Sequence, residues 1–278
     1  MTSLSGKYVL ITGGSRGLGP LIAEALASRG AHIALAARSE AGLAAVAGSL
    51  SRYPVQTIIV PVDLADTKKR IELVSTVLKK FGRIDILINN AGLETEGAYL
   101  ELPWEEIQKT IDVNLTAPMA LTYLVLPSML KQNQGHVVNI ASIAAKCGIA
   151  LAATYCGTKA GLAEWTSGLR LELEGSGVHF STILPGYVKE VGMFARFNII
   201  PHTLAGSCTP AQVVKAVLKA IVRNKSEVII NSTPTRLLFA INEISPSSGD
   251  WLKKKLGLVE FQRKKVLQKG DNPPNFIS

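Results

Sequence analysis

The sequence predicts an α/β fold in which a doubly wound, seven-stranded and mostly parallel sheet forms a single domain. Three observations support this prediction. Short β-branched and apolar runs alternate with longer helical patterns along most of the chain. Most of these runs are apolar without interruption, as expected for parallel strands that are buried on both faces. The 278 residues are also enough to bury one large core without disulfides or metals.

Each expected strand and helix follows from its own stretch of sequence. Apolar runs predict seven strands, at Tyr8–Ile11, Ile33–Ala36, Thr57–Val60, Ile86–Ile88, His136–Ile140, His179–Leu184 and Glu227–Ile230. Apolar residues at helical spacing predict six helices, at Leu18–Ser28, Glu40–Leu50, Lys68–Phe81, Trp104–Lys131, Ala153–Glu174 and Pro210–Arg223. Because strands and helices alternate, right-handed crossovers are expected to bring the strands together as neighbours in one parallel sheet.

Composition and charge exclude several classes of protein. Apolar residues make up 47% and charged residues 18%, which is too apolar for a disordered chain. The three cysteines form no CxxC pair, so we expect neither a disulfide framework nor a metal site. Residues 251–278 carry +5 of the net charge of +9. The basic character thus belongs to this segment and not to the whole protein, so we expect no nucleic-acid partner.

The longest apolar stretch, Pro118–Leu130, is too short to span a membrane, and the first residues do not resemble a secretory signal. We therefore expect a cytoplasmic protein.

The first predicted strand leads into a glycine-rich loop, Thr12-Gly13-Gly14-Ser15-Arg16-Gly17-Leu18-Gly19, and a predicted helix follows the loop. Glycines allow the backbone to turn sharply and to approach a phosphate closely, and the helix N-terminus offers unpaired N–H groups to an anion. A plain tight turn is the alternative. The spaced glycines favour a dinucleotide-binding site of the Rossmann type.

The end of the second predicted strand indicates which dinucleotide binds. NAD sites place an acidic residue there to hold the ribose 2′-hydroxyl. In this sequence the strand ends with Arg38 and Ser39, and Arg16 lies in the glycine-rich loop. Guanidinium groups suit the 2′-phosphate of NADP, so we expect NADP(H) as the cofactor. Solvated surface arginines are the alternative.

A tyrosine and a lysine supply the candidate acid–base chemistry. Tyr155 and Lys159 are spaced i, i+4 in a predicted helix, so they lie on one face of it. A nearby ammonium is expected to lower the pKa of the tyrosine, which then exchanges a proton with a carbonyl or alcohol oxygen. Ser142 follows the fifth predicted strand, at the edge where ligands of open α/β sheets bind. A tyrosine that only packs in a helix is the alternative.

Together these motifs resemble the short-chain dehydrogenase/reductase family, over roughly residues 5–230. The resemblance rests on the glycine-rich loop, on Asp63, on Asn89-Asn90-Ala91-Gly92 and on Pro185-Gly186. It also rests on four residues that match the family's catalytic tetrad: Asn114, Ser142, Tyr155 and Lys159. The cofactor-binding residues that the loops and the resemblance imply are Gly13, Ser15, Arg16, Gly17, Leu18, Gly19, Arg38, Ser39, Asp63, Leu64, Asn90, Ala91, Gly92, Tyr155, Lys159, Pro185, Gly186 and Val188.

The resemblance implies NADP-dependent interconversion of a carbonyl and an alcohol. Tyr155 is then the general acid–base, Lys159 binds the nicotinamide ribose, Ser142 polarises the carbonyl and Asn114 holds a water. The family often has a threonine where this sequence has Glu190. A catalytically weak NADP-binding sensor is therefore a second hypothesis. The resemblance also implies homodimers or homotetramers that pack through residues 104–131 and 153–174.

The predicted substrate is lipophilic. We assign residues 1–232 to the catalytic domain, and the stretch 186–208 to an insertion that covers the substrate. Large apolar residues in Val191–Ile200 favour a lipid, isoprenoid, retinoid or sterol-like ketone or aldehyde, and hence a role in lipid metabolism. A dimer or membrane contact is the alternative for these residues, and a 3-oxoacyl-thioester reductase is the alternative enzyme.

Residues 233–278 form a predicted basic helical extension. Leu252, Leu256, Val259 and Val266 fall near one face of an expected helix over Trp251–Leu267, with the lysine clusters elsewhere. Such a helix either contacts a membrane peripherally, through residues 251–268, or docks its apolar face on the body of the protein or on a partner subunit.

Overall fold

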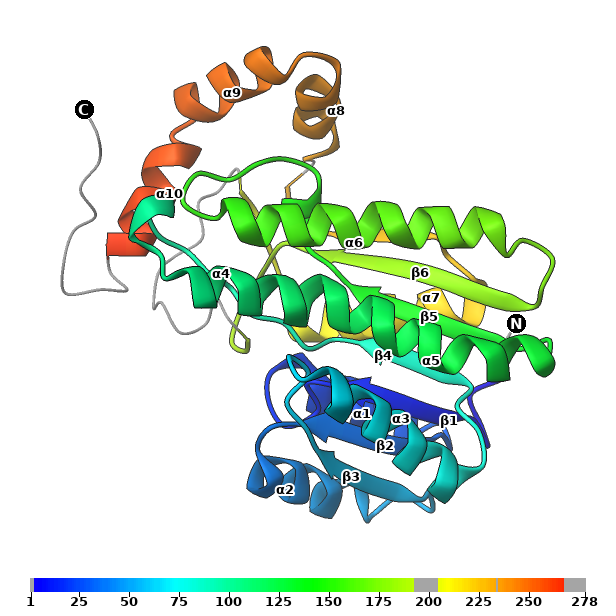
Figure 1. The fold of residues 1–278 in the computed structure, drawn as a ribbon. Coiled ribbons are helices and arrows are strands. Elements are labelled where there is room, and N and C mark those ends of the chain that lie inside the picture. The colour runs from blue at the N-terminus through cyan, green and yellow to red at the C-terminus, as the bar shows by residue number, and fades with distance from the viewer. Residues whose placement is uncertain (1–2, 193–204, 234, 268–278) are drawn as a thin grey trace.

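The structure is a computed structural model that describes residues 3–192, 205–233 and 235–267. Its centre is a seven-stranded sheet in the order β3-β2-β1-β4-β5-β6-β9 (Figure 1). The strands are β1 (Tyr8–Thr12), β2 (His32–Ala37), β3 (Thr57–Pro61), β4 (Ile86–Asn89), β5 (Gly135–Ile140), β6 (Val178–Pro185) and β9 (Glu227–Ile230). Across the described residues, the pairings within this sheet are all parallel. The predicted doubly wound α/β sheet is confirmed.

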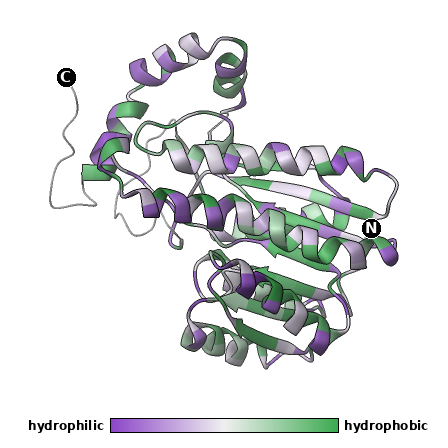
Figure 2. Ribbon diagram, in the orientation of Figure 1, coloured by the Kyte–Doolittle hydropathy of each residue, from purple (hydrophilic) through white to green (hydrophobic). Residues whose placement is uncertain are grey.

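Helices cover both faces of the sheet. One face is covered by α1 (Leu18–Ala27), α2 (Glu40–Leu50) and α7 (Pro210–Arg223). The other is covered by α3 (Thr67–Phe81), α5 (Ala117–Lys131) and α6 (Ala153–Glu172). Figure 2 shows hydrophobic strands between helices of mixed polarity, as two buried faces require. The parallel sheet therefore presents its carboxyl edge, rather than either face, for a binding site.

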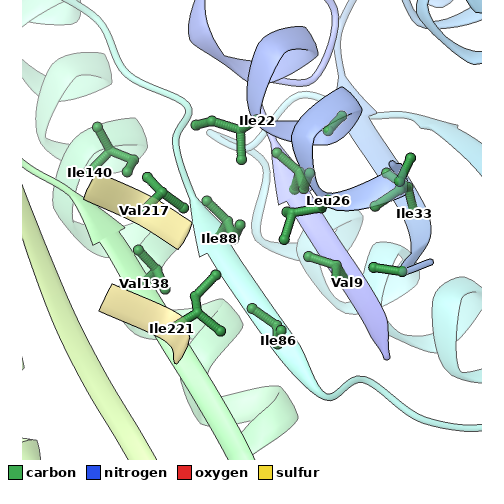
Figure 3. Close-up of a cluster of buried hydrophobic side chains, with 14 of the residues drawn as sticks. Val9, Ile22, Leu26, Ile33, Ile86, Ile88, Val138, Ile140, Val217 and Ile221 are labelled. Carbon is green, nitrogen blue, oxygen red and sulfur yellow. The ribbon is translucent and has the colours of Figure 1, made fainter. Parts of the chain in front are cut away.

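The core between the sheet and α1 and α7 is formed by aliphatic side chains (Figure 3). Leu26 of α1 and Val217 and Ile221 of α7 are completely buried against Ile88 and Val138 of the sheet. Replacing one such buried aliphatic residue by alanine lowers the free energy of unfolding by about 2–5 kcal/mol. This packing fixes the start of α1, and with it the glycine-rich loop, relative to β4 and β5.

The expected helix over Trp104–Lys131 is interrupted by a wider turn. It consists of α4 (Trp104–Ile111), a π-helical segment over Asp112–Thr116, and α5. Among the described helices, this stretch has the length and apolar composition that would suffice to cross a membrane. Leu121, Val125 and Met129 are completely buried in the core on that face of the sheet. Packing on the sheet therefore accounts for the apolar composition of α5.

The expected helix over Trp251–Leu267 is wrong as a single element. The structure has α8 (Arg236–Ile244), α9 (Pro246–Lys255) and α10 (Leu258–Leu267), and Gly257 separates the last two with φ of 73°. This left-handed conformation favours glycine. Figure 1 shows α8 and α9 lying outside the sheet and α10 returning to the body. Lys265 and Val266 are buried, so α10 docks on the body and one of the lysines expected on its polar face is inside.

The insertion over 186–208 is bounded by a short parallel pair, β7 (Tyr187–Val188) and β8 (Ser207–Cys208). This pair joins the two ends of the insertion at the carboxyl edge of the sheet. Met193 to Ile200, on which the lipophilic prediction depends, lie outside the described residues.

His136 predicts a pH dependence of stability. Its side chain is buried on β5 opposite His179 of β6, and its Nε2 lies 2.8 Å from Ser181 Oγ. Burial lowers its pKa from 6.5 to about 3, so only the unfolded chain binds this proton between these values. Neutral His136 therefore contributes fully to the free energy of unfolding above pH 6.5, and this contribution is lost as the pH falls towards 3. Between pH 6.5 and 5 we expect a loss of about 2 kcal/mol in the free energy of unfolding.

The measurement is urea unfolding between pH 7.5 and 5, comparing the wild type with His136→Gln. The variant should lose less stability over this range, by the amount that His136 contributes. Parallel pH profiles for the two proteins would contradict the assignment.

Candidate active site

A cavity of about 1240 Å³ lies at the carboxyl edge of the sheet. Its walls come from the glycine-rich loop, from the segments that follow β4, β5 and β6, and from α6. Residues of α8, α9 and α10 complete its lining, among them Phe239, Val259 and Lys265. The C-terminal extension is therefore part of the wall of this cavity.

The glycine-rich loop is built on close backbone contacts. Gly13 and Gly17 have φ of 68° and 69°, in the region that favours glycine. A Cβ atom on Gly19 would lie 2.1 Å from Gly13 O. Only glycine at position 19 allows α1 to begin directly against the loop, so the predicted role of Gly13, Gly17 and Gly19 in shaping the turn agrees with the geometry.

The start of α1 suits an anion. Side-chain oxygens of Ser39, Asp66 and Thr209 cap α2, α3 and α7. At α1 the N-cap is Gly17, and the described residues provide neither a side-chain cap nor an acidic residue in the first turn. Its first N–H groups are therefore available to phosphate oxygens, and α1 has the positive end of its dipole there. These observations fit the pyrophosphate of a dinucleotide cofactor.

The residues predicted for the adenosine end lie along the ends of β1, β2 and β3. Arg16 lines the cavity, whereas its lining among the described residues does not include Ser15, Arg38, Ser39, Asp63 or Leu64. Arg16 and Arg38 are exposed, and Ser39 Oγ accepts a hydrogen bond from Gly42 N at 3.1 Å. Asp63 accepts one from Ala65 N, and Leu64 is buried in the core. Ser39 and Leu64 thus have structural roles that the sequence analysis did not assign.

Asn90, Ala91 and Gly92 line the cavity beside the glycine-rich loop. Asn90 Nδ2 donates to Thr12 O at 3.0 Å, and the N–H groups of Asn90 and Ala91 donate to Thr12 Oγ1. These bonds hold the segment after β4 against the end of β1. The structure therefore gives Asn90 a structural role, and its contact with the cofactor stays a prediction.

Ser142, Tyr155 and Lys159 meet on the cavity wall, as the sequence predicts. Lys159 Nζ lies 5.7 Å from the centre of the Tyr155 ring and donates to Ile140 O at 3.0 Å. Ser142 lies just beyond β5, where its Oγ accepts a hydrogen bond from Ala144 N. The sheet and α6 thus bring together residues from two elements at the point where a carbonyl oxygen would bind.

Electrostatics favour a protonated Tyr155. Burial raises the pKa of its phenol, and the Glu94 carboxyl raises it further, while a hydrogen bond with Ser142 lowers it. Burial also lowers the pKa of Lys159 to about 8. The pKa of Tyr155 is therefore raised, not lowered as the spacing with Lys159 led us to expect. Tyr155 holds its proton at neutral pH, as a proton donor to a carbonyl must.

Asn114 joins the segment after β4 to α6. It lies in the π-helical segment and is completely buried. Its Oδ1 accepts from Leu93 N at 2.8 Å, and its Nδ2 donates to Leu93 O at 2.8 Å and to Thr158 Oγ1 at 3.2 Å. Its carboxamide is thus engaged with protein groups, and the water that the resemblance implies stays a prediction.

The segment after β6 completes the cofactor side. Pro185, Gly186 and Val188 line the cavity, and a Cβ atom on Gly186 would lie 2.3 Å from Asn231 Oδ1, so a larger residue there would displace the side chain of Asn231. Glu190 is exposed with φ of 68°, and the described cavity lining does not include it. Glu190 therefore gives the sensor hypothesis no support from the geometry.

A buried polar cluster, which was not predicted from the sequence, also lines this cavity. Lys265 Nζ of α10 lies 2.8 Å from Glu94 Oε1 and 2.7 Å from Glu96 Oε1, and Gln262 Nε2 donates to the same oxygen of Glu96 at 2.7 Å. Glu94 and Glu96 directly follow the motif Asn89-Asn90-Ala91-Gly92, and this position could have indicated that they lie at the site. Nothing in the sequence indicates their lysine partner, which lies 169 residues from Glu96.

The fold and the site define an oxidoreductase of the nicotinamide-dinucleotide type. Comparison with known proteins identifies its family. The family model described as short chain dehydrogenase matches residues 7–199. The chain therefore belongs to the short-chain dehydrogenase family, as predicted.

Similar proteins of known sequence or structure support this family assignment. The chain is 42% identical to the ketoacyl reductase HetN of Nostoc sp., over 96% of this chain and 94% of that protein. It is 30% identical to dehydrogenase/reductase SDR family member 7B of Danio rerio, over 82% and 78% of the two chains. A crystal structure of a metagenomic short-chain oxidoreductase in complex with NADP is similar, with a TM-score of 0.70 and 29% identity, over 82% of this chain and 98% of that one.

The buried cluster predicts that Lys265 anchors α10. Lys265→Met leaves the buried carboxyl group of Glu96 and the partly buried one of Glu94 without their cation. Breaking a buried ion pair in this way costs about 3–5 kcal/mol. We expect a lower melting temperature and earlier proteolysis within residues 258–267. Lys264→Met is the matched control, because Lys264 is exposed on the same helix. Equal melting temperatures for the two variants would contradict an anchoring role.

Proposed function

We propose that this short-chain dehydrogenase uses NADPH to reduce a lipophilic ketone or aldehyde to an alcohol. The observation that carries the proposal is the meeting of Ser142, protonated Tyr155 and Lys159 on one wall of a cavity that begins at the uncapped start of α1. This arrangement provides a proton donor beside a dinucleotide site.

The roles of the side chains follow from their positions. Tyr155 donates its proton to the carbonyl oxygen, and the hydroxyl of Ser142 holds that oxygen in place by hydrogen bonding. Lys159, fixed by its bond to Ile140 O, stabilises the phenolate that remains. When bound, the reduced nicotinamide supplies the hydride, so one ketone, one hydride and one proton give one alcohol.

Two arginines support NADP over NAD. Arg16 lies in the glycine-rich loop and Arg38 directly follows β2, where an acidic residue would favour NAD. The similar metagenomic oxidoreductase was solved with NADP. Arg16 and Arg38 would bind the 2′-phosphate.

Apolar lining supports a lipophilic substrate. Ile143 and Ile149, which follow β5, and Leu238, Phe239 and Val259 of the extension line the cavity. Apolar walls favour apolar ligands because contact removes both surfaces from water. A role in lipid metabolism would follow.

A second candidate is the reduction of a 3-oxoacyl thioester. The resemblance to the ketoacyl reductase HetN favours it, since that protein matches nearly the whole of this chain, including the extension. The acyl chain of such a substrate would occupy the same apolar walls.

Location and assembly are part of the proposal. We propose a cytoplasmic enzyme that forms homodimers or homotetramers. Tyr123 of α5 and Leu171 of α6 are 78% and 72% exposed, which supports packing through these helices. Exposed Leu237, Ile244 and Trp251 on α8 and α9 support a peripheral membrane contact.

NADPH consumption by the purified protein tests the enzyme directly. Across a panel of long-chain aldehydes, ketones and 3-oxoacyl thioesters, Tyr155→Phe should lower kcat by about 100- to 10,000-fold, because the proton donor is lost. Binding of NADPH, followed by fluorescence, should persist in the variant. Tight NADPH binding without turnover of any compound that depends on Tyr155 would favour the sensor instead.

The cofactor preference gives a further test. Arg38→Ala should weaken NADPH binding by about 10- to 100-fold, because charge-assisted hydrogen bonds to the 2′-phosphate are lost, and should leave NADH binding nearly unchanged. Arg29→Ala is the control, since Arg29 is exposed beyond the far end of α1. Equal losses for NADPH and NADH would argue against a 2′-phosphate contact.

A further inference from the structure

The cluster of Glu94, Glu96, Gln262 and Lys265 lies on the wall of the same cavity as Tyr155. The side chains of Glu96 and Lys265 are each 1% exposed, whereas that of Glu94 is 15% exposed. Glu94 is therefore the acidic member of the cluster that a molecule in the cavity can reach. Lys265 Nζ, which contacts both Glu94 Oε1 and Glu96 Oε1, holds it in place.

Hydrogen bonds fix Glu94 beside the catalytic helix. Both backbone groups of Leu93 bind the carboxamide of Asn114, which in turn donates to Thr158 of α6. On the other side, Gly97 N donates to Leu151 O at 2.9 Å, in the turn just before α6. The segment that carries Glu94 is thus tied to α6 at both ends. The proximity has an electrostatic consequence, because Glu94 is the strongest charged influence on the pKa of Tyr155.

The cluster has more hydrogen-bond acceptors than donors. Glu96 Oε2 and Gln262 Oε1 are buried without a hydrogen-bond partner among the described residues. Two carboxyl groups share one ammonium group, and burial raises the pKa of Glu94. In either protonation state, Glu94 keeps a carboxyl oxygen that accepts a hydrogen bond. This wall therefore favours donors and cations and disfavours carboxylate or phosphate groups.

We propose that Glu94 recognises a hydrogen-bond donor on the substrate, a hydroxyl or amino group next to the carbonyl that is reduced. This inference rests on the proposed reductase function and narrows its substrate class to lipophilic α-hydroxy or α-amino ketones. Glu94 is the specificity residue, and Lys265 is a positioning residue that acts through it. The C-terminal helix α10 thereby takes part in substrate selection.

Four ketones of one chain length test the proposal. They are decyl methyl ketone, decyl hydroxymethyl ketone, decyl methoxymethyl ketone and the corresponding α-keto acid. The hydroxymethyl and methoxymethyl compounds have similarly activated carbonyls, but only the first has a donor. We expect the wild type to prefer the hydroxymethyl over the methoxymethyl ketone by about 10- to 100-fold in kcat/KM, and to use the keto acid least.

Substitutions assign the preference to Glu94. Glu94→Met should reduce the ratio between the hydroxymethyl and methoxymethyl ketones to about one, and Glu94→Gln should keep part of it, because the amide oxygen still accepts. Lys265 retains Glu96 as a partner in both variants, and circular dichroism checks their folding. Glu260→Gln is the matched control on the outer side of α10 and should keep the full ratio. A ratio that Glu94→Met leaves unchanged would overturn the proposal, as would a wild type without the preference.

Binding separates this proposal from the reductase function. Tyr155→Phe loaded with NADPH should bind the hydroxymethyl ketone about 10-fold more tightly than the methoxymethyl ketone by calorimetry, and adding Glu94→Met should remove the difference. Equal affinities in the Tyr155→Phe protein would overturn recognition by Glu94. Absence of Tyr155-dependent turnover with every ketone would instead overturn the reductase function, and the affinities would still decide the role of Glu94.

Discussion

Parallel pairing within the sheet is the constraint on which the site depends. Parallel strands require a crossover after each strand, so their carboxyl ends meet at one edge and the loops that follow them are neighbours. This geometry brings Gly13, Asn90, Ser142 and Gly186 from four separate loops to one cavity. Both faces of the sheet are covered by helices, so the carboxyl edge provides the opening. The aliphatic core around α1 and α7 then holds the uncapped start of α1 against the same edge.

A second constraint comes from the buried charges between α10 and the segment after β4. A buried lysine with two carboxyl groups is costly to form, and breaking the arrangement is more costly still, because charges are left without partners. Such a cluster contributes little to net stability but fixes one position for α10. Tyr187 adds to it, since Lys265 Nζ lies 5.4 Å from the centre of its ring and Phe261 packs edge-on against that ring. The extension thus becomes a fixed wall of the cavity rather than a separate tail.

Local sequence patterns predicted the strands, the glycine-rich loop and the common helix face of Tyr155 and Lys159, because each depends on short-range spacing. Tyr155 and Lys159 share a face at i, i+4, and Gly19 follows from the backbone turn before α1. The same reasoning failed for the helix over 251–267, because Gly257 adopts a left-handed conformation and divides this stretch into two helices. It also failed for Lys265, whose charge suggests exposure and whose partners are distant in sequence. The raised pKa of Tyr155 was missed for the same reason, since burial and Glu94 act only in the folded chain.

In the proposed site, α10 completes the substrate-binding wall through Glu94. A crystal structure of Tyr155→Phe with NADPH and decyl hydroxymethyl ketone tests it most directly. We expect Lys265 Nζ to stay within hydrogen-bond distance of Glu94 and Glu96, and the hydroxyl of the ligand to donate to Glu94. A structure in which α10 lies away from the body, or in which the hydroxyl contacts other groups while Glu94 does not touch the ligand, would contradict the claim.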